Sequence, residues 1–236
     1  MNVKDVTSRN PLIIINFKTY LEATGRRAVE LSREFARISN ATAVSVAVAP
    51  QFADIAQVAA HMGIPVFAQH TDPIGPGAFT GQVLAESLEA AGADGTILNH
   101  SERTIRLSEI QNVISHVRGL QLLTVVCAGT AESAAAISLM EPDMVAVEPP
   151  ELIGTGRAVS KEKPEVIQNA VRRIRSVNPS VKILCGAGIS SGDDVYAALR
   201  LGAEGFLIAS SIIKAPDPGK VVLEFCAAAR RFAESK

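Results

Sequence analysis

A carboxylate ends an apolar run at residues 144–148, where Met-Val-Ala-Val is followed by Glu148. Two prolines come next, and the segment closes on Gly-Thr-Gly at 154–156. Proline fixes its own φ and cannot extend a strand ladder, whereas glycine keeps the backbone pliable and its amides bare. A base at a strand end, beside a loop that is stiff at one end and soft at the other, suggests a catalytic base under a lid. An ordinary surface loop explains this segment equally well when it is taken alone.

Short β-branched runs alternate along the chain with stretches that have apolar residues at helical spacing, such as Val29, Phe35 and Ile38. Most of these runs are apolar throughout, which is typical of strands buried on both faces of a parallel sheet. The predicted strands are residues 12–16, 43–49, 65–69, 95–99, 122–128, 144–148, 182–186 and 205–208. The predicted helices are residues 26–39, 51–62, 81–91, 108–118, 131–139, 165–177, 193–201 and 220–233.

Eight such units in 236 residues favour an α/β fold, an eight-stranded parallel (β/α)8 TIM barrel forming a single domain over residues 1–236. A doubly wound open sheet is the alternative, but no GxGxxG motif follows the first strand. In a barrel, functional side chains gather at the carboxyl ends of the strands. Polar residues predicted there are Asn16, Lys18, Gln69, His70, Asn99, His100 and Glu148, with small-residue loops at 186–188 and 209–211.

Composition narrows the class of protein further. The net charge is −1 with acids and bases mixed, so no basic block would attract nucleic acid or an anionic membrane. The apolar runs fall far below the roughly 20 residues that span a bilayer, and the first residues lack a signal-peptide core. Cys127, Cys185 and Cys226 lie in apolar surroundings without a CxxC pair, which predicts reduced thiols in a cytoplasmic protein. No HxH, HExxH or carboxylate cluster occurs, so neither a metal nor a cofactor is expected.

Four motifs, taken in chain order, resemble those of the triosephosphate isomerase family. They are Asn-Phe-Lys at 16–18, Gly-Ala-Phe-Thr-Gly at 77–81, Asn-His-Ser-Glu-Arg at 99–103, and Glu-Pro at 148–149 with Ile-Gly-Thr-Gly at 153–156. The short chain, Asn99 before His100, and Cys-Gly-Ala-Gly at 185–188 are similar to the compact archaeal branch of that family. The resemblance implies an isomerase of glycolysis and gluconeogenesis that interconverts dihydroxyacetone phosphate and glyceraldehyde 3-phosphate through an enediolate.

The resemblance also implies a role for each residue of these motifs. Glu148 would be the base that moves the carbon-bound proton, with a pKa raised by an apolar pocket. Lys18 would face the enediolate and the phosphate, and Asn16 would position Lys18 and donate toward a substrate oxygen. Glu102 would be a partner of the lysine and of His100, although a simple acid at a helix start is the other interpretation.

His100 would polarise the substrate oxygens as a neutral imidazole. Residues 101–103 are predicted to be the first turn of a helix, whose amides would disfavour a cationic ring. The other histidines, His61, His70 and His116, are predicted to be buried and satisfied by structural partners.

Phosphate would be bound by backbone amides rather than by arginine. The residues implied are Ile153, Gly154, Gly186, Ala187, Gly188, Ala209 and Ser210. The lid lacks the tryptophan of many family members, and Thr130 stands where many have glutamate, so the contacts that latch the lid differ here.

Loop 77–81 implies self-association, because in the family this loop inserts into a neighbouring subunit. Phe79 would otherwise be an exposed aromatic residue, and Thr80 would pack near the Asn-Phe-Lys segment of the neighbour. The expected assembly is a homodimer or a homotetramer.

Two other functions remain open at this point. One is another phosphate-binding barrel enzyme, such as an aldolase or an amino-acid biosynthetic isomerase, and the other is a non-catalytic sensor. A Schiff-base aldolase needs a lysine on a central strand in an apolar pocket. Lys182 begins a strand rather than ending one, and Lys18 lies past a strand end. A non-catalytic sensor of phosphorylated metabolites would tolerate loss of Glu148 or His100, and both are present.

Overall fold

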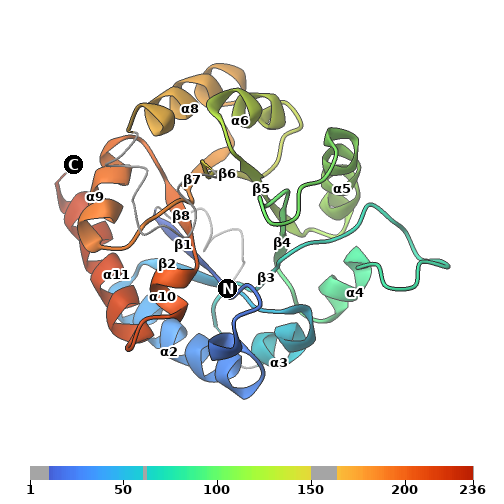
Figure 1. The fold of residues 1–236 in the computed structure, drawn as a ribbon, viewed down its shortest axis with the longest axis horizontal. Helices are drawn as coiled ribbons and strands as arrows, with labels where there is room; N and C mark the ends of the chain where they lie inside the picture. Colours follow the sequence, from blue (N-terminus) through green and yellow to red (C-terminus); the bar gives the residue numbers. More distant parts are fainter. Residues whose placement is uncertain (1–10, 61–62, 150–163, 236) are drawn as a thin grey trace.

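The computed structural model describes residues 11–60, 63–149 and 164–235. Parallel strands form a central ring with helices around it, as Figure 1 shows. The strands are β1 (Leu12–Asn16), β2 (Ser45–Ala49), β3 (Phe67–Ala68), β4 (Gly95–Leu98), β5 (Leu123–Ala128), β6 (Met144–Val147), β7 (Lys182–Cys185) and β8 (Gly205–Ile208). The predicted (β/α)8 barrel is therefore confirmed, with most strands one or two residues shorter than predicted.

The ring closes between β2 and β3. The hydrogen-bonded order of the strands is β2-β1-β8-β7-β6-β5-β4-β3, which leaves these two at its ends. They meet at a parallel bridge between Val48 and Val66, where the Val48 amide donates to the Pro65 carbonyl at 3.0 Å. The predicted strand 65–69 is reduced to two residues, and the Val66 amide donates to the Asp94 side chain at 2.8 Å.

Helices surround the ring, and two of them differ clearly from the prediction. The described helices are η1 (Leu21–Ala23), α2 (Arg26–Thr42), η2 (Phe52–Asp54), α3 (Ile55–Ala59), α4 (Ala85–Ala90), α5 (Leu107–Gly119), α6 (Ala131–Ser138), α8 (Pro164–Val177), α9 (Gly192–Arg200), α10 (Ser210–Ile213) and α11 (Pro218–Glu234). The helix predicted over 81–91 begins only at Ala85, because Gly81 has φ +86° and Leu84 is extended. The helix predicted over 51–62 is a 3-10 turn followed by α3, and α10 was not predicted.

Side chains alternate between the barrel interior and the layer beneath the helices. On β6, Met144 and Ala146 belong to the interior cluster, whereas Val145 and Val147 pack outward. The next inward position is residue 148. The strand period of two therefore aims Glu148 into the mouth of the barrel.

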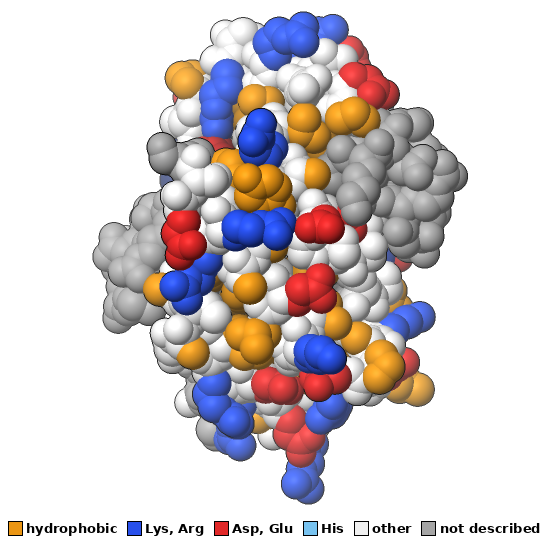
Figure 2. Space-filling view, turned by 90° about the vertical axis from the view of Figure 1, so that its left-hand side faces the viewer, with side chains coloured by type: hydrophobic (Ala, Val, Ile, Leu, Met, Phe, Trp, Pro, Cys, Tyr) orange, Lys and Arg blue, Asp and Glu red, His pale blue; other side chains and the backbone are white. Residues whose placement is uncertain are grey.

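The outer surface carries no continuous region of one charge on the face seen in Figure 2, where basic and acidic side chains are interspersed. Within the described ranges, no helix is both long and apolar enough to cross a bilayer. Cys127, Cys185 and Cys226 are free and buried, as predicted.

Candidate active site

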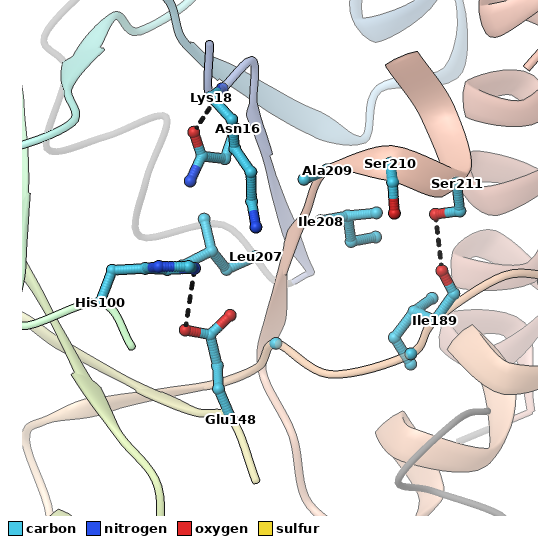
Figure 3. A pocket seen from close by; sticks show the side chains of 12 residues that line it. Asn16, Lys18, His100, Glu148, Ile189, Leu207, Ile208, Ala209, Ser210 and Ser211 are labelled. Atoms are coloured by element: carbon cyan, nitrogen blue, oxygen red, sulfur yellow. Dashed lines mark hydrogen bonds and ion pairs between the residues drawn. The ribbon is translucent and has the colours of Figure 1, made fainter. Parts of the chain in front are cut away.

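A pocket opens at the carboxyl ends of the strands, which is where the sequence placed the functional side chains. Its lining comes from the ends of β1, β6, β7 and β8 and from the loop after β4, and Figure 3 shows these residues. The lining residues are Asn16, Lys18, His100, Glu148, Gly186, Gly188, Ile189, Leu207, Ile208, Ala209, Ser210 and Ser211. Ala187 is buried and does not line it, and Ile153 and Gly154 lie outside the described residues.

Glu148 is the most buried charged group of this pocket, with 4% of its surface exposed. Burial raises its pKa to about 7, against the opposing effects of a hydrogen bond from the Cys127 thiol and the positive charge of Lys18. Its Oε2 atom has no hydrogen-bond partner among the described residues. A carboxylate with a free oxygen and a pKa near neutrality is suited to accept a proton from a bound molecule.

His100 faces Glu148 across the pocket, with its Nε2 atom 3.7 Å from Oε2 of Glu148 (Figure 3). The backbone amide of Glu102 donates to Nδ1 of the ring at 3.2 Å. A ring nitrogen that accepts a hydrogen bond carries no proton, so the proton of the neutral ring lies on Nε2, toward the pocket. Burial and, next, the charge of Lys18 lower the pKa of His100, which keeps the ring neutral.

The helix predicted to begin at residue 101 is wrong. Residues 101–103 form a turn, closed by the Arg103 amide donating to the His100 carbonyl at 2.7 Å, and α5 begins only at Leu107. The Glu102 turn amide therefore fixes the tautomer, while burial and the charge of Lys18, and not the first turn of a helix, lower the pKa of His100.

Lys18 reaches the pocket from a strained backbone position, with φ +48°. Two side chains hold it there. The Asn16 Oδ1 atom accepts from the Lys18 amide at 2.9 Å, and the Gln69 side-chain amide donates to the Lys18 carbonyl at 2.9 Å. The Lys18 ammonium lies 2.8 Å from Oε1 of Glu102, whose side chain is 60% exposed. The positive charge is thereby fixed at the rim of the pocket, above His100 and Glu148.

Loops after β7 and β8 form the opposite wall. Gly188 has φ +70°, a conformation that favours glycine, and the Ser211 hydroxyl donates to the Ile189 carbonyl at 2.7 Å. Ala209 precedes the short helix α10, whose first amides have no intrahelical acceptor. The wall thus offers backbone N–H groups to an anion.

Several residues near the site were given no role from the sequence. Gln69 and Asn99 were placed at strand ends without a function, and Cys127 was treated only as a thiol. Cys127 follows Leu123 and Val125 in the inward phase of β5, a signal that the sequence did contain. It is this phase that brings the thiol to Glu148.

Two further predictions have clear outcomes. His70 is buried and lies 3.0 Å from Asp72, as predicted, but His116 is exposed on α5 and pairs with Glu86, so that prediction is wrong. His61 lies outside the described residues. Thr130 caps α6, its hydroxyl accepting from the Ser133 amide at 3.1 Å.

A sequence model of the family described as triosephosphate isomerase matches residues 11–229. The chain belongs to the triosephosphate isomerase family. It is 50% identical over 214 residues to a triosephosphate isomerase of Methanothermobacter thermautotrophicus, covering 91% of this chain and 93% of that one. A triosephosphate isomerase of Methanobacterium bryantii is 49% identical over 214 residues, covering 91% and 95% of the two chains. One of Methanocaldococcus jannaschii is 46% identical over 213 residues, covering 90% and 97%.

These relatives come from methanogenic archaea, which agrees with the resemblance to the archaeal branch. The match to the triosephosphate isomerase family model includes all of the barrel strands, because the matched range begins before β1 and ends within α11.

Proposed function

We propose that the chain interconverts dihydroxyacetone phosphate and glyceraldehyde 3-phosphate, with Glu148 as the base. The observation that carries this is the buried Glu148 carboxyl, with a pKa of about 7 and a free oxygen, 3.7 Å from Nε2 of His100. The family membership supplies the substrate class.

The reaction moves one proton between neighbouring carbons. Glu148 takes the proton from the carbon beside the carbonyl, which leaves an enediolate, and returns it to the former carbonyl carbon. No atom is gained or lost, so no co-reactant is required. The raised pKa of Glu148 makes its carboxylate a stronger base than an exposed glutamate.

His100 and Lys18 stabilise the charge that develops on the substrate oxygens. The Nε2–H group of His100 donates to the oxygens and passes a proton between them, as its neutral tautomer allows. The Lys18 ammonium attracts the enediolate and the phosphate, and this attraction strengthens when water is excluded. Asn16 and Glu102 act through Lys18, by holding its backbone and its ammonium group.

The phosphate would bind at the wall lined by Gly186, Gly188, Ala209 and Ser210. The Gly186 amide is engaged by the Val147 carbonyl, so the N–H groups for the phosphate would come from the other residues of this wall. The family motif adds Ala187 from the same loop and Ile153 and Gly154 from the segment after β6. A lid formed by that segment would exclude water from the enediolate.

A coupled assay with purified glyceraldehyde 3-phosphate tests the proposal. We expect turnover by the wild type and a loss of at least about 10²-fold in kcat for Glu148→Gln. His116→Gln is a matched control, since it alters an exposed histidine on the barrel wall. Negligible turnover by a folded wild type, or full turnover by Glu148→Gln, would contradict the assignment.

We also propose that the active form is a homodimer or a homotetramer. The loop between β3 and α4 extends away from the barrel (Figure 1), and it carries Phe79 with 44% of its surface exposed. An exposed aromatic side chain on such a loop is suited to insertion into a second copy. Thr80, next to it, would then lie near the Asn16–Lys18 segment of the neighbour.

The aldolase alternative is disfavoured by the position of Lys182. Burial lowers its pKa to about 8, but it lies at the amino end of β7, at the end of the barrel away from Glu148. A Schiff base there would have neither His100 nor Glu148 beside it.

A cytoplasmic location completes the proposal. Three buried free thiols fit a reducing compartment.

A further inference from the structure

Asn99 has an uncommon backbone conformation immediately before His100. Its φ is +57°, a region that few residues other than glycine adopt and that asparagine tolerates better than most. The residue follows the last position of β4, so its conformation sets the direction in which the chain leaves the barrel. His100 is the next residue along that direction.

The Asn99 side chain joins three segments of the barrel mouth. The β4–β5 ladder ends where Leu98 faces Val126. Beyond that point the Asn99 side chain, and not the backbone, links the two strands, because its amide group donates to the Cys127 carbonyl at 3.0 Å. Its Oδ1 atom accepts from the Ile105 amide at 3.1 Å. One half-buried side chain therefore ties the end of β4 to β5 and to the segment before α5.

The two side-chain hydrogen bonds of Asn99, here called the Asn99 clamp, lie next to both proposed catalytic residues, His100 and Glu148. His100 follows Asn99 directly, and its turn is enclosed between Asn99 and Ile105. Cys127, whose carbonyl Asn99 holds, points its thiol at the Glu148 carboxyl. The relative position of His100 and Glu148 thus depends on how β4 and β5 are joined at this level.

We propose that Asn99 is a positioning residue, which clamps the His100 turn to β5 so that the protonated Nε2 faces Glu148. The proposal deepens the isomerase assignment and rests on it for its kinetic consequence. Its structural content, the orientation and tautomer of the His100 ring, stands independently of turnover.

A simpler interpretation is that Asn99 only permits a turn with positive φ. Asn99→Gly distinguishes this interpretation from the positioning role, because glycine adopts that φ freely but makes neither side-chain hydrogen bond. Asn99→Asp keeps an acceptor for the Ile105 amide but places an oxygen against the Cys127 carbonyl oxygen, where no hydrogen bond forms. Gln121→Gly is the matched control, since Gln121 is exposed, has φ +60°, and lies at the amino end of β5.

The test combines kinetics with 15N NMR of the His100 ring in the substrate-free protein. In the wild type and in Gln121→Gly we expect one tautomer, with Nε2 protonated and Nδ1 unprotonated. In Asn99→Gly and Asn99→Asp we expect both tautomers to be populated, so that the 15N chemical shifts of the two ring nitrogens become averaged. We also expect kcat to fall by about 10- to 100-fold with little change in KM, as for a misplaced catalytic group.

Thermal unfolding of each variant shows whether it remains folded at the assay temperature, and Asn99→Asp provides the test if Asn99→Gly does not fold. A folded Asn99→Gly with the wild-type tautomer and wild-type kcat would overturn the proposal. A wild type without isomerase activity would defeat the functional assignment, while the tautomer comparison would still decide the role of Asn99.

Discussion

The Glu148 carboxyl occupies the space that a side chain on residue 186 would fill. A Cβ atom built on Gly186 would lie 2.3 Å from Cγ and 2.5 Å from Oε1 of Glu148. Gly186 ends the pairing with β6, its amide donating to the Val147 carbonyl at 3.0 Å, so neither backbone can retreat easily. The absence of a side chain at residue 186 is therefore a condition for the position of the base.

Gly186→Ala is expected to displace the Glu148 carboxyl. We predict a fall in kcat of about 10²-fold, because misplacing a catalytic group by about 1 Å has an effect of that size. The measurement is steady-state kinetics together with a crystal structure of the variant. Gly119→Ala is the matched control, since a Cβ there meets nothing within 4 Å. Unchanged kinetics in Gly186→Ala would show that the carboxyl does not need its observed position.

The pH dependence of activity should report the ionisation of Glu148. Its pKa is about 7, so the carboxyl is protonated below that pH and cannot accept a proton. We expect kcat/KM to fall by about tenfold per pH unit below about pH 7. Burial and the charge of Lys18 lower the pKa of His100, so its ionisation adds no limb above pH 7.

The phosphate of the substrate titrates near pH 6 and could imitate part of this limb. Infrared titration of the carboxyl band in the substrate-free protein separates the two, because only the wild type, and not Glu148→Gln, should lose a buried carboxylic acid band near pH 7. A carboxyl that titrates at the usual value of an exposed glutamate would refute the prediction.

Replacing Glu148 should stabilise the fold at high pH. Because its pKa rises from 4.5 to about 7 on folding, the native state holds the extra proton between these values, and stability from this group is lost as pH rises through 7. The full shift corresponds to about 3 kcal/mol. Glu148→Gln should thus have a larger free energy of unfolding than the wild type at pH 8, and a similar one at pH 4.5.

Urea unfolding at the two pH values measures this difference. Glu89→Gln, a change at an exposed position on α4, is the control and should alter the free energy of unfolding little at either pH. A Glu148→Gln variant that is no more stable than the wild type at pH 8 would argue that the carboxylate is well solvated.

The loop between β3 and α4 should decide the assembly. Phe79→Asp is expected to weaken self-association by about 2 kcal/mol or more, as when a buried aromatic anchor is lost at an interface. Light scattering would then detect monomers at concentrations where the wild type associates. Leu139→Asp, at an apolar side chain on the barrel wall that is 71% exposed, should leave the assembly unchanged. A stable, active wild-type monomer would contradict the proposed oligomer.

The period-two pattern of the strands made much of this site predictable. Glu148 ends an apolar run whose alternate residues fill the barrel, and Asn16 does the same on β1. Once the strands are parallel and close into a ring, their carboxyl ends must share one rim. This is why residues as distant in sequence as Lys18 and Glu148 could be assigned to one pocket.

Local turn geometry was less predictable. The sequence around residues 101–103 resembles a helix start, yet the chain forms a turn there and delays α5 to Leu107. The turn has local hydrogen bonds from the Arg103 amide to the His100 carbonyl and from the Ile105 amide to the Asn99 side chain. The Asn99 side chain also donates to the Cys127 carbonyl on β5, and local propensity does not contain that distant partner.

The sequence by itself determined the barrel, the set of polar residues at its rim and the chemistry that these residue types allow. Only the tertiary structure decided which nitrogen of His100 carries the proton, which neighbours set the pKa of Glu148, and the need for glycine at residue 186. The reason is physical. Residue type and strand period act along the chain, whereas desolvation, steric exclusion and the choice of hydrogen-bond partner depend on which segments pack together in space.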